Sequence, residues 1–100
     1  MSVGKLNFSM LEYEGFTIVH FQLENSITPN VLKEVVPPKV DPKRGVVLGG
    51  RAPVWLYCYL VHYYHPTKFV AVYDPRLGGA VVVESHTPEF VVGDVIEVRL

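Results

Sequence analysis

Apolar residues recur at every second position in two stretches near the start of the sequence, residues 5–10 and 16–23. A period of two is typical of a strand with one buried face. The segment between them contains Glu12-Tyr13-Glu14-Gly15, a turn signal. The pattern therefore predicts a β-hairpin, with its first strand beginning at Lys5 and its second strand running from Phe16 to Leu23.

Two later segments favour helices. In residues 28–36, Thr28 suits a helix N-cap and Pro29 suits the first helical position, and Pro37-Pro38 ends the segment. The stretch PVWLYCYLVHYYH, which begins at Pro53, has apolar side chains around most of its circumference and contains four tyrosines. Such a helix is buried on more than one side or packs against a second subunit.

The remaining strands complete a mixed α/β pattern. Residues 45–48 form a short buried strand, FVAVY and AVVVES flank a tight DPRLGG turn, and residues 95–100 follow a Gly93-Asp94 turn. The predicted order is β-β-α-β-α-β-β-β. We expect one α+β domain over residues 1–100, with a mixed β-sheet covered by two helices.

Composition narrows the possible partners. Of the 100 residues, 49% are hydrophobic and 19% are charged, a composition typical of a globular protein. This hydrophobic fraction is high for so small a domain, so we expect a protein–protein interface. The net charge is −1, and no run of Lys or Arg could hold long duplex DNA, so a bound nucleic acid would be short and enclosed. Cys58 is the single cysteine, which fits a reducing compartment. We expect a cytoplasmic protein without a membrane segment.

The first candidate for chemistry is Gly49-Gly50-Arg51, between the strand at 45–48 and the second helix. Glycines let a ligand approach the backbone, the N–H groups at a helix start favour an anion, and Arg51 could clamp a phosphate. The same spacing also fits two glycines that merely make a sharp turn after a buried strand. The motif matches no established phosphate-binding loop.

The second candidate is the hairpin at residues 65–86, which places Asp74 and Arg76 in its turn and a histidine, His65 or His86, at each end. Asp followed by Pro is ordinary turn chemistry, in which Asp74 does no more than accept hydrogen bonds from backbone N–H groups. In the functional interpretation, an acid and an imidazole shuttle a proton or bind a metal, and Arg76 stabilises charge on a phosphate. Histidine, carboxylate and phosphate oxygens would suit a weakly held Mn²⁺ better than a permanent zinc.

Three stretches of this sequence, GVVLGGRAPVWLYCYLVHYYH, FVAVYDPRLGGAVVVESH and GDVIEV, resemble a small CRISPR-associated family linked to type III systems. The resemblance implies a distant variant of the CRISPR-associated Rossmann-like (CARF) fold, with ferredoxin-like character. It also implies a Mn²⁺-dependent RNA deadenylase or a ring nuclease that linearises cyclic tetra-adenylate. Members of the family assemble as dimers that can enclose the ligand, which suggests a homodimer here, or a tetramer around the ligand.

The resemblance assigns roles residue by residue. The catalytic histidine, aspartate and arginine of the family fall on His65, Asp74 and Arg76. The histidine after V-x-S falls on His86, so the implied metal ligands are His65, Asp74 and His86, and Gly49, Gly50 and Arg51 are the implied ligand-binding turn. Where relatives often carry serine, this chain has Gly49.

Two further readings stay open at this level. A non-catalytic sensor would bind the cyclic nucleotide and signal to a partner, and a plain interaction module would use the aromatic helix as its interface. The pattern of residues also leaves open whether a water molecule or the ribose 2′-OH attacks the phosphodiester.

Overall fold

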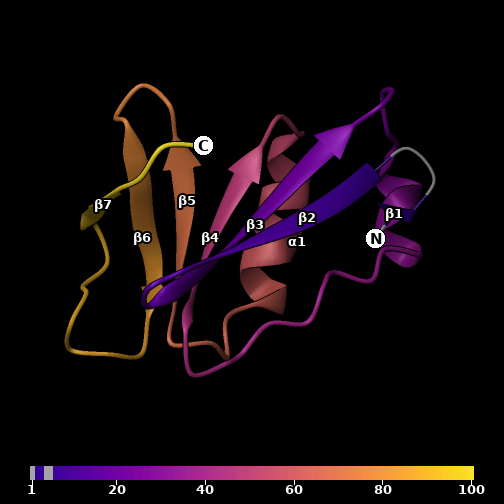
Figure 1. Ribbon diagram of the computed structural model, residues 1–100. Coiled ribbons are helices and arrows are strands. Elements are labelled where there is room, and N and C mark those ends of the chain that lie inside the picture. The colour runs from indigo at the N-terminus through magenta and orange to yellow at the C-terminus, as the bar shows by residue number, and fades with distance from the viewer. Residues whose placement is uncertain (1, 4–5) are drawn as a thin grey trace.

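The computed structural model describes residues 2–3 and 6–100 (Figure 1). Within these residues, seven strands form one sheet in which the spatial order follows the chain order. One 3₁₀ helix and one α-helix accompany the sheet. The elements are β1 (Ser2–Val3), β2 (Leu6–Tyr13), β3 (Phe16–Leu23), η1 (Pro29–Lys33), β4 (Gly45–Gly50), α1 (Val54–Tyr63), β5 (Phe69–Asp74), β6 (Gly79–Ser85) and β7 (Val95–Glu97).

The sheet is mixed, as the sequence predicts. The strands β3, β4 and β5 are mutually parallel, and all other neighbours are antiparallel. Parallel neighbours need crossover connections, and these are the segment that carries η1 and the segment that carries α1. The carboxyl ends of the three parallel strands therefore lie along one edge of the sheet, at the top of Figure 1.

Both crossovers cover the same sheet face, on which the first of two buried clusters lies. Leu56 and Leu60 of α1 pack there against β-strand residues such as Val46, Leu48 and Phe21, and η1 adds Val31 and Leu32 at the margin. The opposite face carries the second cluster. Its members are Ile18, Val47, Phe69, Ala71, Ala80, Val82 and Val98. The central parallel strands are thus buried on both faces, which explains their continuous apolar sequence.

The prediction of two helices is wrong. Residues 29–33 form only a 3₁₀ helix with no buried residue, and the side chain of Thr28 makes no capping hydrogen bond. Starting an α-helix costs several fixed dihedrals before its first hydrogen bond forms. With Pro37-Pro38 so close, the segment is too short to recover that cost.

The predicted strand limits differ from the structure at both ends. The predicted start at Lys5 lies outside the described residues, and the first hairpin strand continues to Tyr13. The last strand ends at Glu97 instead of residue 100. Its continuation turns onto the face opposite α1, where Val98 is buried in the second cluster.

The outer side of α1 stays exposed. Val54 and Cys58 both face solvent, so part of the apolar surface of this helix is not buried by the rest of the chain. The predicted packing of this helix on a second subunit remains a prediction. No helix in the described part of the chain is both long enough and apolar enough to cross a membrane.

A buried tyrosine ties the first crossover to the end of α1. The Tyr64 hydroxyl donates a 2.5 Å hydrogen bond to the Pro38 carbonyl, and burial raises the pKa of this phenol. Tyr64→Phe leaves that carbonyl without its partner and should lower the free energy of unfolding by about 1–3 kcal/mol. Urea unfolding measures the change. Tyr63→Phe, at an exposed neighbour, is the control, and an unchanged midpoint for Tyr64→Phe would contradict the assignment.

Candidate functional site

A cleft opens at the edge where the parallel strands end. Its volume is about 250 Å³. In open α/β sheets, ligands bind outside the carboxyl ends of the strands, so its position alone marks this cleft as a candidate site. Its walls come from β3, β4, α1, β5 and the residues that follow them: His20, Gly50, Arg51, Tyr57, Tyr73, Pro75 and Leu100.

Gly50 forms the floor of the turn into α1, and its conformation requires glycine. Its φ is +145°, and an added Cβ would lie 2.2 Å from the Phe21 carbonyl oxygen. The Tyr57 hydroxyl donates to the Gly50 carbonyl from the first turns of α1, and burial raises the pKa of this phenol. The turn is therefore held rigidly, with the backbone of Gly50 bonded from the helix side.

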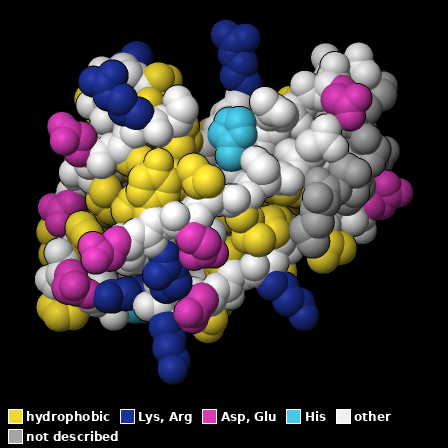
Figure 2. Space-filling model, in the orientation of Figure 1, with side chains coloured by type: hydrophobic (Ala, Val, Ile, Leu, Met, Phe, Trp, Pro, Cys, Tyr) yellow, Lys and Arg dark blue, Asp and Glu magenta, His cyan; other side chains and the backbone are white. Residues whose placement is uncertain are grey.

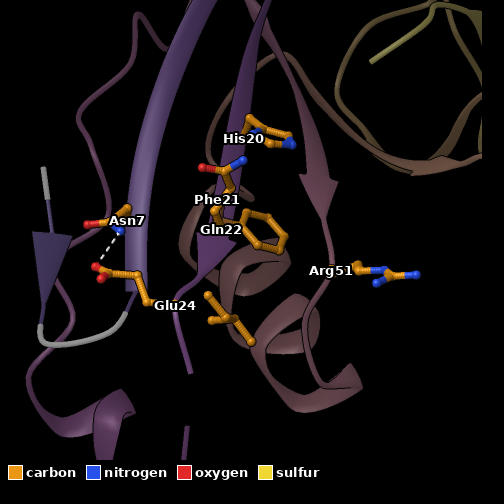
Figure 3. Close-up of a pocket in the computed structure, with 7 residues that line it drawn as sticks. Asn7, His20, Phe21, Gln22, Glu24 and Arg51 are labelled. Carbon is orange, nitrogen blue, oxygen red and sulfur yellow. Dashed lines mark hydrogen bonds between the residues drawn. The ribbon is translucent and has the colours of Figure 1, made fainter. Parts of the chain in front are cut away.

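Arg51 follows at the rim of the cleft. It also borders a second cleft of about 500 Å³, which runs beside the start of β2 and the end of β3. In Figure 3 the Arg51 side chain points away from His20 and Gln22 and out of the fold. The Asn7 amide and the Glu24 carboxylate, by contrast, are joined by a 3.0 Å hydrogen bond. Within the described residues no carboxylate pairs with Arg51, so its guanidinium is available to an anion.

Asp74 ends β5 on the same edge, and it makes the contacts of an ordinary turn. Its Oδ1 accepts the Arg76 backbone N–H at 2.9 Å, and its Oδ2 accepts from the Arg76 guanidinium at 3.3 Å. The guanidinium and these backbone bonds lower the pKa of Asp74 below its usual 3.8. Asp74 is therefore an anion at neutral pH that pairs with the exposed Arg76, the residue after Pro75, which forms part of the cleft wall.

The lowered pKa gives Asp74 a testable effect on stability. A carboxylate whose pKa falls on folding stabilises the fold above its unfolded pKa, and this contribution disappears as the pH drops through the folded pKa. Asp74→Asn keeps an oxygen for the backbone bond but removes the charge. We expect wild type to melt above this variant at pH 7, and the gap to close as the pH falls below 3.8. A gap that widens toward acid would contradict this account.

The two predicted histidines lie at the opposite edge of the sheet. His65 follows α1 and His86 follows β6, so both stand at the end where β5 begins. The His86 ring Nε2 lies 3.0 Å from the His65 carbonyl oxygen, and the two rings are 6.0 Å apart. The His62 ring stacks on that of His65, also at 6.0 Å. Three imidazoles therefore cluster here, with Glu84 3.9 Å from His86.

The predicted metal ligands do not converge in one chain. His65 and His86 are separated from Asp74 by the length of β5, and no described group of three His, Cys, Asp or Glu residues could hold a metal ion. A Mn²⁺ ion held by both His65 and Asp74 would thus need ligands from two copies.

Only two of the three residues of the predicted ligand-binding turn line the cleft. Gly50 and Arg51 border the cleft, but Gly49 lies one residue earlier, beneath Leu100. Sequence reasoning missed His20, Tyr57 and Tyr73. His20 is the most informative of these, because its strand pairs in parallel with β4 and sets it directly beside Gly49. A prediction that this histidine-bearing strand pairs in parallel with the strand before the glycine turn would have placed His20 at the site.

Comparison with known proteins identifies the family. The family model described as "CRISPR-associated protein (Cas_csx3)" matches residues 20–97, which include every residue that lines the cleft except Leu100. An uncharacterized protein of Aquifex aeolicus (strain VF5) is 46% identical over 100 aligned residues, which cover 96% of this chain and 85% of that relative. The chain therefore belongs to the Cas_csx3 family of CRISPR-associated proteins.

Proposed function

We propose that this chain is a CRISPR-associated phosphodiesterase that cleaves cyclic tetra-adenylate, removes 3′ adenylates from RNA, or does both. The observation that carries the proposal is the cleft at the carboxyl edge of the parallel strands. It combines an outward-pointing Arg51 with aromatic walls from Tyr57 and Tyr73. An arginine binds phosphate, and aromatic faces stack on bases in a way that tolerates any sequence. Short, enclosed nucleotides suit a chain whose net charge is −1.

In this proposal the catalytic site is shared between copies. Asp74 and Arg76 stand at one edge of the sheet and His65 at the other, separated by the six residues of β5. At about 3.3 Å per residue this strand spans roughly 17 Å, far beyond hydrogen-bond reach. A second copy that meets the cleft with its histidine edge would complete the set. Two or more copies would also supply several arginines to a ring of phosphates.

The chemistry then follows from the residues. The imidazole of His65 takes the proton from a ribose 2′-OH, whose oxygen attacks the adjacent phosphorus. The P–O5′ bond breaks, the 5′ oxygen takes a proton from water, His65 returns its own proton to the solvent, and the product ends in a 2′,3′-cyclic phosphate. Arg76 neutralises the charge that grows on the phosphate, Asp74 fixes the orientation of Arg76, and Arg51 binds a phosphate equally before and during the reaction. Attack by water would give a linear phosphate end directly, so the ends of the products distinguish the two routes.

A non-catalytic sensor is the second candidate. It is favoured by the separation of His65 from Asp74, because a single chain can bind through its cleft but lacks the combined set for cleavage. A sensor would retain Arg51 binding and release no product.

The deciding experiment is incubation with labelled cyclic tetra-adenylate and, separately, with RNA that ends in 3′ adenylates. Each is run with Mn²⁺ and with a chelator, and the products are resolved by chromatography. Linear or shortened products support the phosphodiesterase. Binding without product supports the sensor and contradicts the catalytic proposal. Activity only with Mn²⁺ would show that the metal is needed and would replace the metal-free route given above.

Arg51→Ala should weaken substrate binding more than it slows the bound reaction. The outward side chain contacts phosphate equally in the ground state and in the transition state, so its loss raises KM and spares kcat. One charge-assisted hydrogen bond corresponds to roughly a tenfold change or more. Steady-state kinetics measure it, with Lys33→Ala in η1 as the control for a lost surface cation. An unchanged KM with a collapsed kcat would instead make Arg51 catalytic.

A further inference from the structure

The side chain of Leu100 occupies the place of the side chain that Gly49 lacks. A Cβ built on Gly49 would lie 2.1 Å from the Leu100 Cδ1 atom and 3.5 Å from the Tyr73 Cβ. Any larger residue at Gly49 must therefore push Leu100 away. The absent side chain of Gly49 is a socket on the sheet face opposite α1, and Leu100 fills it.

The segment that carries Leu100 crosses this face of the sheet. Figure 1 shows it leaving β7 and passing in front of β6 and β5, on the side away from α1. Its two ends differ in how firmly they are held. Val98 is 6% exposed within the second buried cluster, whereas Leu100 is 45% exposed. The segment is anchored at Val98, and the side chain of Leu100 rests in the socket with about half its surface in water.

Leu100 also separates two clefts. Together with His20 it borders the candidate site of about 250 Å³. The same two residues border an apolar cleft of about 370 Å³ against β2, which Met10 and Leu11 line and Arg99 flanks. In the space-filling view, hydrophobic side chains gather in the middle of this face (Figure 2). Without the Leu100 side chain, the two clefts would meet beside His20.

We propose that residues 98–100 form a strap, anchored at Val98, whose Leu100 closes the candidate site at Gly49 and is displaced when a nucleotide binds. With Leu100 out of its socket, the joined cleft offers Arg51 at one end and Arg99 at the other, with apolar walls between. Two separated cations around an apolar floor suit a ligand with at least two phosphates and an intervening base. The ligand class rests on the proposed function, whereas the socket itself does not.

The socket is tested on the protein alone. Gly49→Ser should lower the melting temperature, because its Cβ and hydroxyl take the place of Leu100. In the double variant with Leu100→Ala this loss should be largely relieved, since neighbours that share a contact are not additive. Leu77→Ala, at an exposed turn leucine, is the matched control and should rescue nothing. If the two substitutions lower the melting temperature additively, the proposal that Leu100 fills the space at Gly49 is wrong.

Displacement is tested by titrating cyclic tetra-adenylate into wild type, Leu100→Ala and Leu77→Ala, with calorimetry for affinity. We expect Leu100→Ala to bind at least threefold more tightly, because no strap must be moved, and Leu77→Ala to match wild type. Equal affinity in all three proteins would overturn the strap and leave the proposed function intact. No binding by any of them would overturn both the displacement of Leu100 by this ligand and the cleavage of cyclic tetra-adenylate, whereas the socket stands or falls with the melting temperatures.

Discussion

Asp74→Ala should reduce phosphodiester cleavage roughly a hundredfold or more while the protein remains folded. The carboxylate holds the Arg76 guanidinium at the edge of the cleft through both of its oxygens. Without it, Arg76 is free to rotate away from the phosphate. Loss of one preorganised charge at a reacting phosphate typically costs two to three orders of magnitude in rate, about 10²–10³.

Asp94 offers a matched control for this variant. Like Asp74, it is a turn carboxylate that accepts a backbone N–H, here from Val91 at 2.9 Å. It belongs to the turn before β7, away from the residues that line the cleft. Asp94→Ala should therefore disturb folding to a similar degree and leave cleavage near wild type. If both variants keep full activity and differ only in melting temperature, Asp74 is a turn residue and nothing more.

The sequence predicted the fold class because the relevant signals are local. The period of two at residues 16–23, the DPRLGG turn and the Gly49-Gly50 break each depend on a few neighbouring residues. The missed features depend on tertiary contacts. The segment expected to form a helix at residues 28–36 has Thr28 at its start, but Thr28 makes no capping hydrogen bond, and Val31 and Leu32 are only partly buried. The last strand ended early because Val98 gains more by entering the second cluster.

The candidate site was predictable only in part, for the same reason. Residues that share a motif with a turn, such as Arg51 and Asp74, were found from the sequence and lie on one edge of the sheet. His20 was missed because only the parallel pairing with β4 places it beside the glycine turn. Whether His65 meets Asp74 also depends on contacts beyond the single chain, since β5 separates the two edges.

Because β5 separates His65 from Asp74, we expect variants of these two residues to complement each other. A mixture of His65→Ala and Asp74→Ala, each inactive by itself, should regain a substantial fraction of wild-type activity. A mixed assembly contains junctions at which an intact histidine edge faces an intact Asp74 edge. Such head-to-tail contacts join two different surfaces, so one defect in each copy leaves some sites whole. The control is His62→Ala, which removes the ring stacked on His65 but leaves His65 in place. This variant should cleave the substrate without a mixing partner.

The most direct test of the shared site is therefore the cleavage rate of labelled cyclic tetra-adenylate across mixing ratios of the two inactive variants. Subunit exchange is verified in the same samples by native mass spectrometry. The account predicts only residual activity at either end of the series and a maximum near equal proportions. No activity at any ratio, despite demonstrated exchange, would show that each subunit must supply a complete site and would contradict it.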